Sequence, residues 1–292
     1  MSGPAWAALS GVGFGLFQAI NGQAVRDLRS VYASTFLQLV VAAGILAVAA
    51  ATTEDLATLG DAPAWPLTAF ALAGLVHFFV GWTTLNLSQT RIGAARTSPL
   101  LATTPVFGLV FGAAAASQLP GATAVAGIAL TIAGAYLVSD PGGGSRATAR
   151  DSIFALATAC AWSLSPILTL AGLDGLDSPL LGVTLGMFTA AAAYGALLAV
   201  SASRLDLSAG TREALALKVV AGVVVALATW GRWVAIDGAD VAVVLALNLL
   251  SVPVVLLVAP ILSGRHVEMV TAKIWAGAGL VMLGSLVLIL AV

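Results

Sequence analysis

Ten continuously apolar stretches of about 20 residues, separated by short polar breaks, dominate this sequence. A helix of that length crosses the roughly 30 Å hydrocarbon core of a bilayer. The strands of a membrane barrel would instead alternate apolar and polar residues. The sequence therefore predicts an all-α polytopic protein with ten transmembrane helices and the lipid bilayer as its surroundings. The expected spans are residues 4–23, 31–51, 65–87, 93–116, 121–139, 152–172, 179–201, 214–236, 241–262 and 272–292.

The composition excludes most soluble classes of protein. Of the 292 residues, 60% are hydrophobic and 9% are charged, which leaves too little polar surface to cover a water-soluble globule. The net charge of -1 provides no basic stripe for nucleic acid. One cysteine and two histidines do not form the usual metal-ligand clusters, so we expect no metal or other cofactor. The N-terminus lacks Lys and Arg before its first apolar stretch, so we interpret that stretch as a retained helix rather than a signal peptide.

The two halves of the chain repeat one another. An offset of 148 residues carries Phe14 to Trp162, Gly74 to Gly222, Trp82 to Trp230 and Pro105 to Pro253. After the proline the offset becomes 150, and it carries Gln118 to Glu268, Gly127 to Gly277 and Gly134 to Gly284. Landmarks in the same order at a nearly constant offset indicate a duplication. Because five helices per half is an odd number, the second copy enters the membrane from the opposite side, and the repeats are inverted.

A polar segment separates the two copies. It contains Pro141, three consecutive glycines and the charged side chains of Asp140 and Arg146. Glycine and proline disfavour a helix, and the charges require water, so we expect a solvated linker. The predicted organisation is a first five-helix repeat at residues 1–139, the linker at 140–151 and a second five-helix repeat at 152–292.

Positive charge is distributed unevenly over the predicted topology. Eleven of the twelve Lys and Arg residues, Lys218 among them, fall in or beside the loops on the linker face. Arg232 is the exception, and the loops of the other face carry acidic residues. Loops rich in Lys and Arg stay in the cytoplasm. We therefore expect a protein of the plasma (inner) membrane whose linker face is cytoplasmic and whose two termini are extracytoplasmic.

Each half also has a proline in its fourth span and then an acidic or amide residue nine positions before a glycine. The residues are Thr104-Pro105-Val106, Gln118, Gly127 and Gly134 in the first copy, and Val252-Pro253-Val254, Glu268, Gly277 and Gly284 in the second. This pattern resembles the EamA-type transporters of the drug/metabolite transporter superfamily over almost the whole chain. Gln118 departs from the glutamate that is usual in the family, and many members keep their termini in the cytoplasm. The resemblance implies a transporter fold, without naming a substrate.

Charged and ionisable side chains deep in the spans are the first site candidates, because inverted repeats bind substrate near the midplane, where the copies face each other. His77 lies near the middle of the third span, where it either senses or carries a proton or makes an interhelical hydrogen bond. Arg232 lies four residues before the end of the eighth span. It either binds an anionic group or reaches the water near Asp237 and Asp240.

Aromatic and amide side chains complete the candidate site. Trp82 and Trp230 hold equivalent repeat positions and form either opposite walls of a cavity or part of an interfacial aromatic belt. Trp162 is a deeper wall candidate. Amides are hard to satisfy within one helix, so three of them are expected to line the cavity: Gln18, Gln38 and Asn248.

Two mid-span prolines, Pro105 and Pro253, each remove a backbone hydrogen bond and kink their helices. The bends serve either as gating points or as static curvature. Together with the family resemblance and the charge distribution, these features predict a secondary active transporter, an exporter of small metabolites, that works by alternating access with a proton as the candidate coupling ion. A monomer is sufficient for this mechanism, and a homodimer is compatible with it.

Two other functions share some of these features. A lipid-headgroup flippase on the same fold would need a side opening and a polar groove. An intramembrane enzyme would need a nucleophile with a base, or paired acids, inside the membrane, and the acidic residues cluster in the predicted loops instead. The sequence contains no Gly-x-x-x-x-Gly-Lys-Ser/Thr stretch for ATP, so energy is expected from an ion gradient or from the substrate itself. No catalytic residue is predicted.

Overall fold

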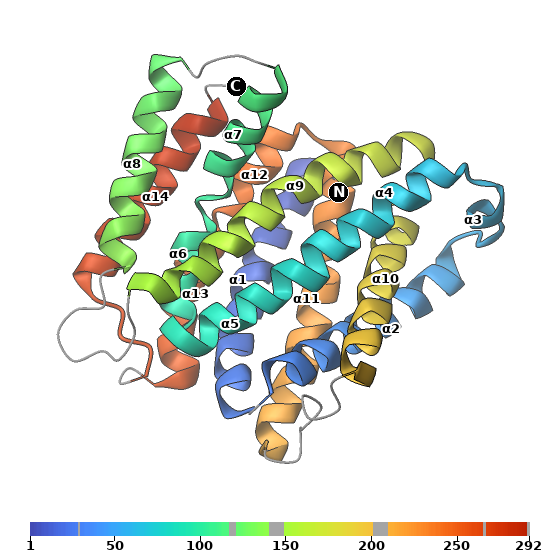
Figure 1. The fold of residues 1–292 in the computed structure, drawn as a ribbon, viewed down its shortest axis with the longest axis horizontal. Coiled ribbons are helices and arrows are strands. Elements are labelled where there is room, and N and C mark those ends of the chain that lie inside the picture. Colours follow the sequence, from blue (N-terminus) through green and yellow to red (C-terminus); the bar gives the residue numbers. More distant parts are fainter. Residues whose placement is uncertain (29, 117–120, 140–148, 201–209, 265–266, 291–292) are drawn as a thin grey trace.

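The computed structural model describes residues 1–28, 30–116, 121–139, 149–200, 210–264 and 267–290, and these residues form helices and turns without a strand (Figure 1). Eight helices are long and apolar enough to cross a membrane. The predicted class, an all-α multi-pass membrane protein, is therefore confirmed. Gln118 and most of the linker lie outside the described residues.

The first half of the chain begins with a long helix and contains one helix with an irregular centre. The elements are α1 (Gly3–Asp27), α2 (Val31–Thr53), the short α3 (Ala57–Asp61), α4 (Ala64–Gly74), the π-helix η1 (Leu75–Gly81), α5 (Trp82–Ile92), α6 (Ala94–Leu101), α7 (Thr104–Ala116) and α8 (Ala122–Ser139). The segments α4, η1 and α5 form one continuous rod. The sequence predicted neither α3 nor the π-helix.

The second half follows the same order after a short 3-10 turn, η2 (Ala149–Ser152). Its helices are α9 (Ile153–Gly175), α10 (Pro179–Val200), α11 (Arg212–Gly238), α12 (Val241–Asn248), α13 (Ser251–Ser263) and α14 (Ala272–Leu290). Each predicted span overlaps one of these helices, the α4–α5 rod or a broken pair. Neither α1 nor the pair α6–α7 is among the eight candidate membrane spans.

Both helix breaks follow from the mid-span prolines. Pro105 and Pro253 have no N–H to donate to the carbonyls of Leu101 and Leu249, four residues earlier. The chain leaves the helix there, between α6 and α7 and between α12 and α13. The hydroxyl of Thr104 donates to the freed carbonyl of Leu101 at 2.6 Å. Each proline therefore lies just after a two-residue turn that divides its helix, and α12 with α13 still forms one candidate membrane span.

Glycines allow two helices to pack closely at one end of the molecule, where α8 lies against α14 (Figure 1). A Cβ on Gly134 would lie 2.5 Å from the carbonyl oxygen of Gly277, and a Cβ on Gly284 would lie 2.7 Å from that of Gly127. Only residues without a side chain fit this crossing. The four glycines of the sequence repeat thus form one helix–helix interface.

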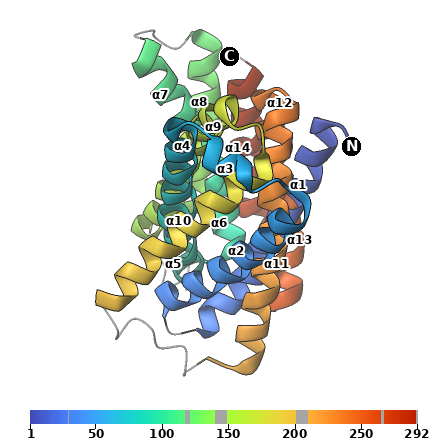
Figure 2. The ribbon, with the colours of Figure 1, turned by 90° about the vertical axis from the view of Figure 1, so that its right-hand side faces the viewer.

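The two halves of the chain interlock. Helix α1 packs along α11 and against α13, and α9 packs along α4 and against α7. Helix α2 packs against α10 and α11 (Figures 1 and 2). Neither half therefore forms a separate body, and the core lies between helices of both. The start of α1 and the end of α14 lie toward the same end of the bundle.

Candidate functional site

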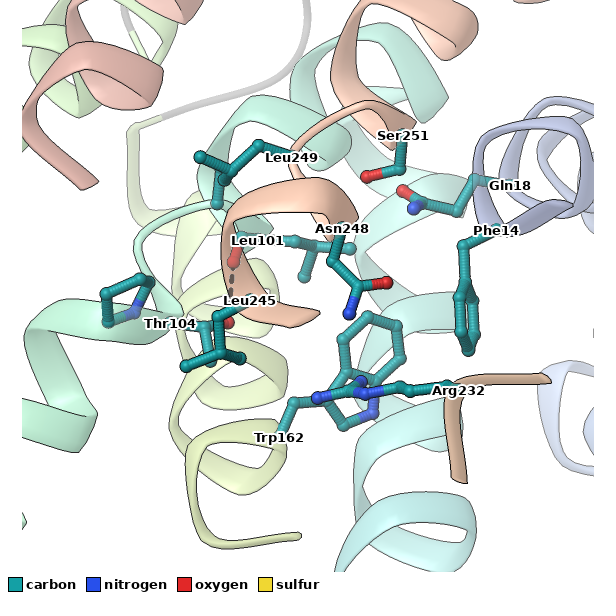
Figure 3. Close-up of a pocket in the computed structure, with 12 residues that line it drawn as sticks. Phe14, Gln18, Leu101, Thr104, Trp162, Arg232, Leu245, Asn248, Leu249 and Ser251 are labelled. Carbon is teal, nitrogen blue, oxygen red and sulfur yellow. Dashed lines mark hydrogen bonds between the residues drawn. The ribbon is translucent and has the colours of Figure 1, made fainter. Parts of the chain in front are cut away.

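A cavity of about 60 Å³ lies where α1, α9 and α11 meet the two helix breaks (Figure 3). We call it the central cavity. It is smaller than the roughly 300–1,000 Å³ of typical small-molecule sites, so a metabolite fits only after the helices move apart. Its lining residues are Phe14, Gln18, Leu101, Ala102, Thr104, Pro105, Trp162, Arg232, Leu245, Asn248, Leu249 and Ser251.

Arg232 carries the charge of the central cavity. Its side chain is 6% exposed and extends across the cavity beside Trp162 (Figure 3). Among the described residues that line the cavity none is acidic, and none of the described carboxylates forms an ion pair with Arg232. The alternative that Arg232 reaches water beside Asp237 or Asp240 is therefore not what the structure shows. A buried guanidinium without a counter-charge is unfavourable and needs another compensation.

Two amides bring unpaired polar atoms to the same cavity. Gln18 is buried, and its Oε1 has no hydrogen-bond partner among the described atoms. The Nδ2 of Asn248 is likewise buried without a partner in the described part of the chain. Figure 3 shows both side chains directed into the cavity from α1 and α12. The cavity therefore offers free donors and a free acceptor, as buried polar groups rarely do.

Trp162 forms an aromatic wall and is supported from behind by His77. Its ring lies 6.1 Å from that of Phe14 and stacks on His77, with 5.1 Å between ring centroids and 10° between planes. The Trp162 indole N–H donates to the carbonyl of His77 at 3.3 Å. The π-helix η1 holds His77, and π segments of this kind are frequent at functional sites.

His77 itself does not line the central cavity. It is fully buried, its Nδ1 pairs with the hydroxyl of Ser165 at 3.0 Å, and its Nε2 has no partner among the described atoms. The side chain therefore makes the interhelical hydrogen bond that the sequence offered as one alternative. Its direct contact with the wall residue Trp162 makes it a positioning residue for the cavity.

Several predicted site residues lie elsewhere. Trp82 packs in the core against Phe17, with ring centroids 6.1 Å apart, and Trp230 packs against Trp6 at 5.8 Å. Both rings turn toward α1, so the two tryptophans are not opposite walls of the central cavity. Gln38 is fully buried in α2 with both amide atoms unpaired in the described structure, away from the cavity. Of the two prolines, Pro105 lines the cavity and Pro253 does not.

Lys218 was expected beside a loop of the linker face, and this expectation is wrong. The residue lies inside α11 with none of its surface exposed. Its ammonium donates to Oδ1 of Asn21 and, at 3.4 Å, to Oδ1 of Asn86. Asn21 donates in turn to Asn86 and to Gln89, both at 2.6 Å, and Asn86 donates to Thr35 at 2.6 Å. This polar cluster joins α1, α2, α5 and α11.

The position of Lys218 within a predicted span was the signal that pointed to burial, together with Asn21 and Asn86 in or near other spans. The side chain of a lysine near a helix end usually extends to the membrane interface, and this general rule led to the wrong expectation for Lys218. Burial becomes favourable here because amide oxygens from two other helices accept the hydrogen bonds of the ammonium.

Glu268 is the acidic residue of the second-copy sequence pattern. It connects the end of α1 with the start of α6 on the linker side. Its carboxylate accepts the N–H groups of Ala94 at 2.9 Å and Ala95 at 3.1 Å, at the start of α6. It also pairs with Arg26 at 3.0 Å. A negative charge at a helix N-terminus is stabilising. Glu268 is therefore a helix cap rather than part of the central cavity.

A second cavity, of about 250 Å³, opens beside Glu268. Three arginines line it: Arg26, Arg91 and Arg96. Arg26 pairs with Glu268, and Arg91 pairs with Asp151 at 2.9 Å. Arg26 and Arg91 thus each have a carboxylate partner, whereas Arg232 forms no ion pair with a described carboxylate.

Comparisons with known proteins agree with this architecture. The model of the EamA-like transporter family matches residues 1–140. A solved structure described only as "Crystal structure of protein" is similar with a TM-score of 0.60 and 19% identity, over 96% of this chain and 95% of that one, which shows a shared fold. The search of curated proteins gives no match. Residues 1–140 of this multi-pass membrane protein therefore match the EamA-like transporter family.

Proposed function

We propose that this transporter is a secondary active exporter of small metabolites that works by alternating access at the central cavity. The observation that carries the proposal is the position of the cavity between two interrupted helices, one from each half of the chain. Discontinuous helices at the interface of inverted repeats form the substrate sites of many secondary transporters. Interruptions also permit a helix to bend during transport.

The contacts between helices support ten spans arranged as two inverted repeats, with α1 and the pair α6–α7 added to the eight candidate spans. Packing occurs in reciprocal pairs, α1 on α11 and α9 on α4. Gly74 lies against Gly186, and Gly222 lies against Gln38, and both pairs follow the same offset of 148 residues. Phe14 contacts its own repeat equivalent, Trp162. A pseudo-two-fold axis between these two rings accounts for all of these pairs.

Two barriers separate the central cavity from the two faces of the membrane in this proposal. On the linker side the Lys218 cluster closes the space between α1, α5 and α11. On the opposite side Phe70 packs against Trp233 in a tilted arrangement, with ring centroids 5.6 Å apart. Lys218 and Phe70 are separated by the repeat offset of 148 residues. Equivalent positions thus hold a polar barrier on one side and an aromatic barrier on the other.

The orientation in the plasma membrane follows from charge. Arg26, Arg91, Glu268 and Asp151 meet at the linker side of the bundle, and the remaining described arginines outside the helix centres lie near the same helix ends. By the positive-inside rule this side is cytoplasmic and the termini are extracytoplasmic. A proton remains the candidate coupling ion.

Accessibility of one cavity residue from both faces tests alternating access. Cys160 is replaced by serine, and Ser251, which lines the cavity, is replaced by cysteine. A membrane-impermeant thiol reagent is applied to right-side-out and to inside-out vesicles. We expect slow modification from both faces, because each conformation opens one barrier.

The matched control is Thr58→Cys in the exposed helix α3, which should react only in right-side-out vesicles. Reaction of Ser251→Cys from a single face under all conditions would contradict alternating access. Reaction of Thr58→Cys only in inside-out vesicles would overturn the orientation while leaving the mechanism in place.

A further inference from the structure

Arg232, the charged residue of the central cavity, differs from the arginines that form ion pairs. Arg26 and Arg91 lie nearer the surface, and each has a carboxylate partner. Arg232 is more deeply buried, and within the described structure it has neither an ion pair nor a hydrogen bond. Burying a guanidinium without a counter-charge is unfavourable, and a bound anion would relieve that cost. The protein therefore holds a cationic site whose counter-ion the described chain does not supply.

The neighbouring polar atoms match one small anionic group. The guanidinium presents parallel N–H donors that suit the two oxygens of a carboxylate. The unpaired Nδ2 of Asn248 points toward Arg232 from across the cavity and adds a further donor (Figure 3). One positive charge with one amide fits a monoanion better than a phosphate dianion. The unpaired Oε1 of Gln18 remains available to accept a hydrogen bond from the rest of the ligand.

The apolar walls of the central cavity indicate the chemistry of the rest of the ligand, to which the anionic group is attached. The ring of Trp162, stacked on His77, and the ring of Phe14 form flat apolar surfaces beside Arg232. The other described lining residues are mainly aliphatic, such as Leu101, Leu245 and Leu249. Flat apolar bodies bind such walls with favourable ring contacts.

We infer that the central cavity selects small organic monocarboxylates with a flat apolar body, and that Arg232 binds the carboxylate. The inference rests on the proposed transport function and names its substrate class. Asn248 assists Arg232, and Trp162 holds the apolar body. The donors of Arg232 and Asn248 leave an uncharged amide isostere poorly accommodated, because the amide offers one acceptor oxygen instead of two.

Thermal unfolding of the purified full-length protein in detergent tests the inference with matched probes. The probes are phenylacetate and indole-3-acetate, the corresponding amides, and phenethylamine. A ligand that binds the folded state raises the melting temperature, and the stabilisation grows with the logarithm of one plus the ratio of ligand concentration to Kd. We expect at least one carboxylate to bind about tenfold or more tightly than its amide, with no stabilisation by the amine.

Variants of Arg232 test whether this residue produces the preference for the carboxylate over the amide. Arg232→Gln should abolish the preference for the carboxylate, and Arg232→Lys should retain part of it, because lysine keeps the charge without the planar fork. Arg91→Gln, which removes an arginine outside the central cavity, should bind like the wild type. If Arg232→Gln does not fold, the difference between carboxylate and amide in the wild type decides the question alone. Equal binding of carboxylates and amides, or binding by none of the carboxylates, would overturn the inference.

The outcome is separable from the proposed function. Transport of a neutral or cationic solute, without binding of the carboxylates, would overturn the inference and leave the transport function intact. Arg232-dependent binding of a carboxylate, without two-sided accessibility of the cavity, would support the inference and overturn alternating access.

Discussion

Within the described residues, the hydrogen bonds of the buried Lys218 ammonium go to neutral side chains. Asn21 and Asn86 accept its hydrogen bonds, and Gln89 and Thr35 orient these two amides. Such a cluster is stable only while every member has its partner, because an unpaired charge in a nonpolar interior is costly. The cluster therefore links helices of both halves through Lys218, and few other residues could replace it at this position.

Asn21→Leu should lower the free energy of unfolding by on the order of 3 kcal/mol, because it removes the nearest acceptor of a buried charge. The double variant Asn21→Leu/Lys218→Met should recover much of this loss, since the charge is then absent. Unfolding in detergent by denaturant measures both. A double variant as unstable as Asn21→Leu would show that the charge is not what the cluster accommodates.

His77 has two roles that substitution can separate. His77→Phe should preserve binding and transport, because a phenyl ring can still stack beneath Trp162 although the hydrogen bond to Ser165 is lost. His77→Ala should weaken both at least about tenfold, since the wall loses its support and a cavity forms behind it. Binding in detergent and uptake into liposomes measure the two effects. Loss of transport with retained binding in His77→Phe would instead identify His77 as a proton carrier.

At the scale of elements, the interrupted helices explain both what sequence patterns predicted and what they missed. Pro105 and Pro253 predicted irregular helices, because the missing backbone N–H follows from the residue type alone. The π-helix η1 has no comparable marker, since its seven residues are also compatible with an ordinary helix. His77 in this segment packs against α9, a contact between distant segments that local sequence patterns do not contain.

Pro105→Ala and Pro253→Ala should leave stability unchanged or raise it, because alanine restores the hydrogen bond to the carbonyls of Leu101 and Leu249. Straightened helices should bend less readily, so transport should fall by about tenfold or more in the double variant, as is common when a conformational step is impaired. Thermal unfolding and liposome uptake measure the two quantities. Unchanged transport would show that the breaks are static.

The α8–α14 interface offers a packing test with an internal control. Gly134→Ala places a Cβ 2.5 Å from the carbonyl oxygen of Gly277, so it should destabilise the protein by about 1–3 kcal/mol. Gly279→Ala, in α14, meets no atom within 4 Å and should be neutral or slightly stabilising. Unfolding of both variants in detergent measures the contrast. Equal effects would contradict the close crossing of these helices.

At the scale of the whole molecule, the predicted sequence repeat was informative because an inverted duplication would make specific contacts reciprocal. It related Phe14 to Trp162, and these rings meet beside the central cavity. It also related Trp82 to Trp230, and these rings lie apart, because the offset gives equivalent positions without giving the face of the helix that each side chain occupies. Predicting the central cavity would have required knowing which helices of the two halves pack against each other. Such contacts are not readable from local periodicity.

Interlocking bears on how the protein could move. With α1 packed on α11 and α9 packed on α4, rocking of the halves as separate bodies would break these contacts. In the proposed mechanism, bending at the two helix breaks and alternate opening of the Lys218 and Phe70 barriers are the movements compatible with this packing. Each barrier contains residues from both halves, so opening either one rearranges contacts between them.

Uptake of solutes through the central cavity tests this account most directly. Liposomes containing the protein are incubated with a mixture of small metabolites, and their contents are measured by mass spectrometry. Ala102→Phe fills the cavity without changing charge, and Ala129→Phe adds the same ring to an exposed position of α8. We predict that the wild type and Ala129→Phe accumulate at least one solute above protein-free liposomes, and that Ala102→Phe does not. Transport by Ala102→Phe at the wild-type rate would contradict the account.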